Sequence, residues 1–122
     1  MNKEQAIQSF WESFGLPAYD EQTVPSDVTL PYITYSVATA SLNEVVAMTA
    51  SIWYKSTSWK NITDKKDEIA RAIGPGGKVV KLDSGYMWIN RNAPFAQRVS
   101  DETDDTIRRY YLQLLVEFLT ED

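Results

Sequence analysis

The chain has 122 residues, and its hydrophobic share of 43% is enough for a single folded domain with one core. It contains no cysteine and no histidine, which excludes disulfides and thiolate metal sites and removes the commonest general base and zinc ligand. No apolar run approaches the length of a membrane span, and the first residues do not resemble a secretory signal. We therefore expect one soluble domain over residues 1–122, with no membrane partner.

The charges of the chain fall into three bands. Residues 1–54 carry one base and six acids, residues 55–98 carry nine bases and four acids, and residues 99–122 carry two bases and seven acids. The corresponding net charges are −5, +5 and −5. Either the fold gathers these bands into faces that attract neighbouring copies, or it mixes them so that no patch exists. The sequence leaves both alternatives open.

The first residues predict an amphipathic helix over 3–14. Asn2 and Gln5 have the spacing of a capping box, and Gly15 and Pro17 end the segment. Its apolar residues repeat at helical spacing: Ile7, Phe10, Trp11 and Phe14. Such an aromatic stripe is more often core than a ligand site.

Residues 15–30 predict an extended surface arm. The segment and its end contain three prolines, at positions 17, 25 and 31, and each pushes the residue before it into extended geometry. An arm of this kind either packs back on its own domain or lies on a neighbouring molecule.

Alternating residues predict strands over 32–39 and 45–55, joined through turn residues 41–44 as an antiparallel hairpin. A second helix is expected over 59–73, closed by Gly74 and Pro75.

The remaining segments predict a second hairpin, a loop and a final strand. Residues 78–82 and 85–90 form the hairpin, and 92–105 form a surface loop. Residues 106–119 form the final strand, and its even positions from Tyr110 to Phe118 are continuously apolar, as in a strand with one buried face. We therefore predict an α+β fold in the order α-β-β-α-β-β-β, with one mostly antiparallel sheet flanked by two helices.

The sequence contains no convincing catalytic motif. The glycine-rich run at 74–78 lacks the spacing and the strand-to-helix context of a phosphate-binding loop. Asp101, Glu102, Asp104 and Asp105 are close enough to share Ca²⁺ or Mg²⁺, but a calcium loop's glycine is missing, so a solvated acidic loop is favoured. We expect no catalytic residue, no metal and no cofactor, and a protein that is not an enzyme.

One stretch interleaves aromatic and basic residues: Trp53, Tyr54, Lys55, Trp59 and Lys60. Such a pattern is typical of a platform for single-stranded nucleic acid. The chain's isoelectric point of about 4.7 opposes it, because nucleic-acid-binding domains are usually basic. A small nucleic-acid-binding module therefore stays an alternative.

Three segments carry a resemblance to a known family: LPYITYSVATASLNE, SIWYKSTSWKNITDKKDEIARAIG and GYMWINRNAPFAQRVSDETDDTIRRYYLQLLVEFLTED. Together they resemble the tail-terminator, or tail-completion, proteins of long-tailed bacteriophages, as found in prophages of Gram-positive bacteria. The most distinctive pieces are residues 56–59 and 94–98.

The resemblance implies a structural protein without a cofactor, with a sheet flanked by two helices and a homo-oligomeric, hexameric ring as its assembly. The ring would cap the finished tail tube and join it to the head connector during virion assembly. Its partners would be other copies of the chain, the major tail protein and head–tail connector proteins, with DNA only as passing cargo. The implied location is the host cytoplasm during assembly and then the virion tail. Another neck or minor tail protein, such as a head–tail joining protein, is the alternative within the same class.

Seven residues are candidates for contacts with partners: Trp53, Lys55, Trp59, Phe95, Arg98, Arg108 and Arg109. Phe95 either tucks onto its own core or contacts another subunit. The three arginines pair either with acids of the next copy or with Asp101–Asp105 of the same chain.

Overall fold

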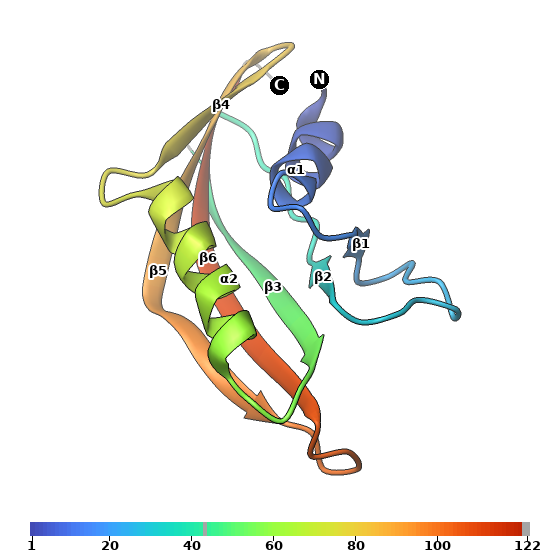
Figure 1. Ribbon diagram of the computed structural model, residues 1–122. Coiled ribbons are helices and arrows are strands. Elements are labelled where there is room, and N and C mark those ends of the chain that lie inside the picture. The colour runs from blue at the N-terminus through green and yellow to red at the C-terminus, as the bar shows by residue number, and fades with distance from the viewer. Residues whose placement is uncertain (43, 121–122) are drawn as a thin grey trace.

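The computed structural model describes residues 1–42 and 44–120. Its six strands form one curled sheet in the order β1-β2-β3-β6-β5-β4, and two helices lie within the curl (Figure 1). In chain order the elements are α1 (Lys3–Glu12), β1 (Ala18–Asp20), β2 (Tyr32–Tyr35), β3 (Glu44–Lys55), α2 (Lys60–Ile73), β4 (Lys78–Leu82), β5 (Gly85–Ser100) and β6 (Ile107–Thr120).

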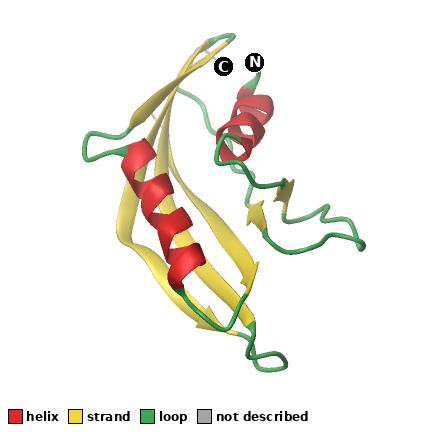
Figure 2. Ribbon diagram, viewed as in Figure 1, coloured by secondary structure: helices red, strands yellow, loops and turns green. Residues whose placement is uncertain are grey.

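The predicted fold class is wrong in both element order and strand direction. Sheet dominates the molecule (Figure 2), and an unexpected strand, β1, lies inside the predicted 15–30 arm. β1 pairs in parallel with β2, with Ala18 opposite Ile33, because the loop over residues 21–31 carries the chain back before β2 begins. The sheet is therefore mixed, and the order is α-β-β-β-α-β-β-β.

The predicted 92–105 loop is also wrong over most of its length, because residues 92–100 belong to β5. Pro94 lies within this strand although proline cannot donate to a strand ladder. The pairing resumes after a bulge: Arg91 lies opposite Leu114, and Ala96 lies opposite Leu112. Beyond Ile89 no described strand pairs with the outer side of β5, and proline is tolerated at such an edge and in a bulge.

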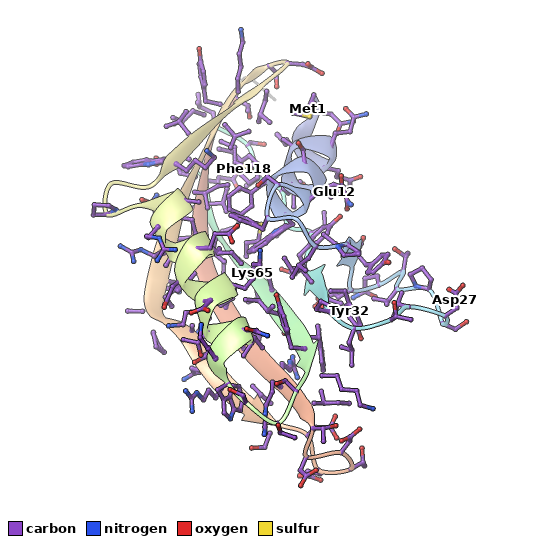
Figure 3. All side chains as sticks on the ribbon, viewed as in Figure 1. Met1, Glu12, Asp27, Tyr32, Lys65 and Phe118 are labelled. Carbon is purple, nitrogen blue, oxygen red and sulfur yellow. The ribbon has the colours of Figure 1, made fainter. Side chains whose placement is uncertain are left out.

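β6 is confirmed as a long strand, and it lies in the middle of the sheet between β3 and β5. Its even positions are buried as predicted: Tyr110, Leu112, Leu114, Val116 and Phe118. Both helices cover this face, and their buried side chains join one core with it. Figure 3 shows Phe118 directed toward α1, and the ammonium of Lys3 lies 5.5 Å from its ring centre. We call the opposite side of the sheet the open face.

The two helices start and pack for different reasons. At α1 the predicted capping box is present, since the Asn2 side chain accepts the Gln5 amide at 2.8 Å and the Gln5 side chain accepts the Asn2 amide at 3.0 Å. α2 has no side-chain cap at Trp59. Three buried isoleucines hold it on the sheet: Ile62, Ile69 and Ile73. Helical segments were thus predicted to within a few residues at each end.

The two predicted antiparallel hairpins are confirmed, with Ile33 opposite Ile52 in the first and Val80 opposite Met87 in the second. β2 ends at Tyr35, earlier than predicted. Asn43, in the predicted turn over 41–44, lies outside the described residues.

Candidate functional site

Three predicted interaction residues, Trp59, Arg98 and Arg108, meet near the start of α2. Trp59 immediately precedes the helix, Arg98 comes from β5, and Arg108 and Tyr110 come from β6. Arg98 lies opposite Tyr110 in the strand pairing, so both side chains emerge on the helix-covered face. We call these four residues the arginine cluster.

The Trp59 ring is the centre of the arginine cluster. The guanidinium carbon of Arg98 lies 4.5 Å from the ring centre and that of Arg108 lies 5.1 Å from it. Arg98 donates from Nε to the Tyr110 hydroxyl at 3.1 Å, and Arg108 donates from Nη2 to the Thr57 carbonyl at 3.0 Å. The two guanidiniums are thus held by rings and neutral oxygens, and neither forms an ion pair with a described residue.

The charge of the cluster acts on Tyr110. Burial of this side chain raises the pKa of its hydroxyl, but hydrogen bonds with Thr63 and Arg98 and the charges of Arg98 and Lys66 lower it more. The net result is a pKa below the ordinary 10.0. The Nε of Arg108 is a buried hydrogen-bond donor that has no acceptor within residues 1–42 and 44–120.

A second group lies on the open face: Tyr19, Tyr32, Trp53, Arg109 and Tyr111. The ring centres of Tyr32 and Trp53 are 6.1 Å apart and nearly stacked, and Tyr19 lies 6.0 Å beyond Tyr32. Arg109 places its guanidinium 4.6 Å from the Trp53 ring and donates from Nε to the Ser51 hydroxyl at 3.0 Å. This open-face cluster is therefore an aromatic ladder over three strands, with one arginine at its end.

The seven predicted residues therefore do not form one site. Trp59, Arg98 and Arg108 meet in the arginine cluster, whereas Trp53 and Arg109 lie on the open face. Lys55 sits at the end of β3, and its ammonium lies 3.8 Å from Asp104. Phe95 is half-buried against its own core, the first of the two alternatives for that residue.

The predicted aromatic–basic platform is divided between the two faces. Trp53 lies on the open face, and Tyr54, its neighbour in the strand, is half-buried against the core. Sequence reasoning missed the four tyrosines of the two clusters: Tyr19, Tyr32, Tyr110 and Tyr111. Strand alternation along 106–119 already placed Arg108 and Tyr110 on one face and Arg109 and Tyr111 on the other, which was the available signal.

The acidic loop between β5 and β6 uses its carboxylates to form turns. Asp101 Oδ1 accepts the amides of Thr103 at 2.8 Å and of Asp104 at 3.0 Å, and Asp104 Oδ1 accepts the Thr106 amide at 2.9 Å. Hydrogen bonds, first from the Thr103 and Thr106 side chains, lower the pKa of both carboxyls. None of the three arginines pairs with this loop, and the described residues contain no cluster of three or more groups suited to a metal.

Strand order answers the question that the charge bands left open. Residues 1–54 build α1 and the β1-β2-β3 side of the sheet, and residues 55–98 build α2 and the β5-β4 side (Figure 1). Within the sheet, the strands of the acidic and basic bands therefore lie on opposite sides of β6, although the start of α1 contacts β4. We call these two sides the acidic flank and the basic flank.

Several charges on each flank form no ion pair with a described residue. On the basic flank the α2 lysines pair with α2 acids, including Lys60 with Asp64 at 2.8 Å. Four exposed bases there form no ion pair with any described residue: Arg71, Lys78, Lys81 and Arg91. Six acids of the acidic flank form none either: Glu4, Glu12, Asp20, Glu21, Asp27 and Glu44.

The upper part of the open face carries exposed apolar side chains: Val45, Val79, Tyr86, Trp88 and Leu119. Strand pairing aligns three of them in one row across the sheet, because Val45 and Trp88 both lie opposite Glu117 and Val79 lies opposite Trp88. Isolated exposed apolar residues are common, whereas apolar residues gathered on one surface are typical of protein contacts.

One open hollow beside the start of α1 contains two carboxylates. Its lining includes Glu4, Asp83, Lys3 and Ser84. The Asp83 carboxylate pairs with the Met1 ammonium, and this hollow is remote from the arginine cluster.

No helix in the described part of the chain is long and apolar enough to cross a membrane. Comparison with protein-family models, with curated proteins and with solved structures finds no significant match to this chain.

Proposed function

We propose that this protein is a structural subunit that joins copies of itself side by side in a ring, as a tail terminator of a long-tailed bacteriophage. The observation that carries the proposal is the separation of unpaired acids and unpaired bases onto opposite flanks of the sheet. Opposite flanks meet when copies associate head to tail, and such contacts close into a ring if the rotation per subunit divides a full turn. The sequence resemblance adds the hexamer.

In this proposal the ring caps the tail tube and receives the head connector. Its two ends would contact the major tail protein and the head–tail connector, and DNA would pass through the centre without being read. The protein would assemble in the host cytoplasm and remain in the virion tail. It would use no cofactor and catalyse no reaction.

The test is the mass and shape of the purified protein. We expect light scattering at rising concentration to show association, and electron microscopy to show rings with a central hole. A protein that forms rings only after purified tail tubes are added would still act as a terminator that needs a template. A protein that stays monomeric at every concentration and also fails to bind tail tubes would rule the proposal out.

The open-face cluster favours one second candidate, a module that binds single-stranded nucleic acid. Its stacked Tyr32 and Trp53 rings with Arg109 at the end match the stacking surfaces of such modules. The net charge of −5 opposes it. Titration with a labelled oligonucleotide at two salt concentrations separates the candidates, since salt-sensitive binding that Trp53→Ala abolishes would favour the module.

A different neck or minor tail protein is the remaining alternative. Such a protein would also associate with itself, but it would bind to a different part of the virion. We expect the terminator to bind purified tail tubes at one end, and binding to heads alone would identify a head–tail joining protein.

A further inference from the structure

We infer that the arginine cluster is the receptor for an acidic arm of the next copy, residues 21–30, whose carboxylates are Glu21 and Asp27. This inference rests on the proposed function, because it names the surfaces through which two subunits of the ring would meet. It assigns a binding role to four residues, Trp59, Arg98, Arg108 and Tyr110, and a class of ligand to them, a carboxylate-bearing peptide.

The receptor consists of the guanidiniums of Arg98 and Arg108, which are restrained by contacts but not neutralised by an acid of the described chain. Arg98 and Arg108 lie 4.5 and 5.1 Å from the Trp59 ring centre, which restrains their side chains before a ligand arrives. Each guanidinium has five N–H donors, and only one donor atom of each is used within the described chain. Carboxylate and phosphate groups both have oxygens that match the remaining donors.

The surroundings favour a short peptide over a phosphate backbone. The lysines of α2 beside the cluster are already neutralised by Asp64, Asp67 and Glu68. Among the α2 lysines and the arginines of the cluster, Arg98 and Arg108 therefore carry the positive charge that the α2 acids do not pair. A nucleic-acid strand needs a continuous positive groove, whereas one or two carboxylates need only a local positive spot.

The receptor also lies at an edge of the sheet that another chain can approach. β4 pairs with β5 only over Gly85–Ile89, so the outer side of β5 around Arg98 faces no described strand. The Arg98 side chain is exposed at this edge. An extended segment that runs along β5 would bring its side chains to the cluster.

The arm, residues 21–30, projects from the acidic flank, away from the basic flank that carries Arg98 (Figure 3). Figure 3 shows Asp27 at its tip, pointing away from the sheet and both helices. Glu21 and Asp27 are exposed and form no side-chain hydrogen bond or ion pair within residues 1–42 and 44–120. Their position on the flank opposite to Arg98 is what a head-to-tail contact requires, because the two surfaces must differ.

Site-directed disulfide cross-linking tests the contact directly, because the wild-type chain has no cysteine. Ser26→Cys places a thiol on the arm beside Asp27, and Ser100→Cys places one on β5 beside the cluster. Both serines are exposed. We expect a mixture of the two variants to give a disulfide-linked dimer under mild oxidation, and the double variant to give a ladder of oligomers. Each single variant alone is the matched control and should stay uncross-linked, since identical positions do not meet in a head-to-tail contact.

Charge exchange tests the chemistry. Replacing both arginines, Arg98→Glu with Arg108→Glu, should weaken association at least tenfold, and Glu21→Arg with Asp27→Arg should do the same. Mixing these two proteins should restore association between them. Circular dichroism would show whether the glutamates prevent folding. In that case Arg98→Gln with Arg108→Gln, which removes the two charges without reversing them, takes their place. Lys81→Glu is the control on the basic flank and should weaken association less.

The outcomes separate this inference from the ring itself. If wild-type protein forms rings but the arginine variants do so equally well, or if the 26–100 pair fails to cross-link within those rings, the receptor assignment is wrong and the ring stands. If wild-type protein neither associates nor binds tail tubes, both fall. If the monomer binds an oligonucleotide or inorganic phosphate through Arg98 and Arg108 while association is unchanged, the site is an anion site of another kind and the inference is overturned.

Discussion

Leu114 and Leu115 are neighbours in β6 whose side chains lie on opposite sides of the sheet. Leu114 is fully buried in the core, and Leu115 is partly exposed on the open face. We expect Leu114→Ala to lower the free energy of unfolding by about 2–5 kcal/mol, because it removes methyl groups and leaves a cavity. Leu115→Ala is the matched control and should cost clearly less. Urea unfolding followed by tryptophan fluorescence measures both, and equal losses would contradict the assignment of the faces.

Tyr110 gives a second prediction at the scale of one residue. Its pKa in the folded protein lies below 10.0, so the ionised hydroxyl favours the folded state. This contribution to stability is complete above the unfolded value and is lost as the pH falls through the lowered folded pKa. Burial raises the pKa of Tyr32, Tyr35 and Tyr54 instead.

A titration of tyrosine absorbance at high pH therefore tests the electrostatics of the arginine cluster. We expect Tyr110→Phe to remove a component that ionises before those of Tyr32, Tyr35 and Tyr54. Arg98→Gln should move that component to higher pH, because both a hydrogen bond and a positive charge are lost. An unchanged titration in Arg98→Gln would mean that the arginine does not act on the hydroxyl in solution.

Among the elements, α1 depends most visibly on a local signal, its capping box. We expect Asn2→Ala to destabilise the protein by about 1 kcal/mol, because the Gln5 amide loses its acceptor at the helix start. Asn61→Ala is the comparison, since Asn61 is exposed near the start of α2 and its side chain forms no described hydrogen bond. Thermal unfolding of the two variants separates a cap effect from a general cost of removing asparagine.

The elements that could be predicted are those with a local signal. The alternation of β3 and β6 and the apolar spacing of the helices each occur within one stretch of sequence. β1 has three residues, too few for a periodic pattern, and it exists only because β2 lies beside it. Pro94 can lie within β5 because β4 pairs with β5 only as far as Ile89, and the sequence around Pro94 does not show where β4 ends.

Three residues of the arginine cluster, Trp59, Arg98 and Arg108, could be singled out from the sequence, but their spatial arrangement could not. Before the bulge, the odd positions of β5 such as Met87 and Ile89 face the helices, and after it the even positions Ala96 and Arg98 do. The bulge therefore reverses which side chains reach the core face. Without it, Arg98 would face outward, away from Trp59. No alternation pattern in the sequence carries this information.

At the scale of the whole molecule, the opposite flanks predict how association responds to salt. Screening shortens the reach of exposed charges from about 10 Å at 0.1 M salt to about 3 Å at 1 M. We expect the oligomer to dissociate, or to form more slowly, as salt rises over this range. Analytical ultracentrifugation at several salt concentrations measures it. Association that strengthens with salt would instead indicate contact through the apolar row of Val45, Trp88 and Val79.

The central position of β6 has a consequence for how the protein is made. β6 is synthesised after all five other strands, yet it alone connects the β1-β2-β3 group to the β4-β5 group in the sheet. Until β6 has left the ribosome, the edges of β3 and β5 that pair with it have no partner strand. Such edges pair readily with other chains, and long-range strand pairing is slow. The cellular yield of folded protein should therefore depend on how quickly β6 is synthesised and released. Slowing translation over the β6 codons should increase the aggregated fraction of newly made protein.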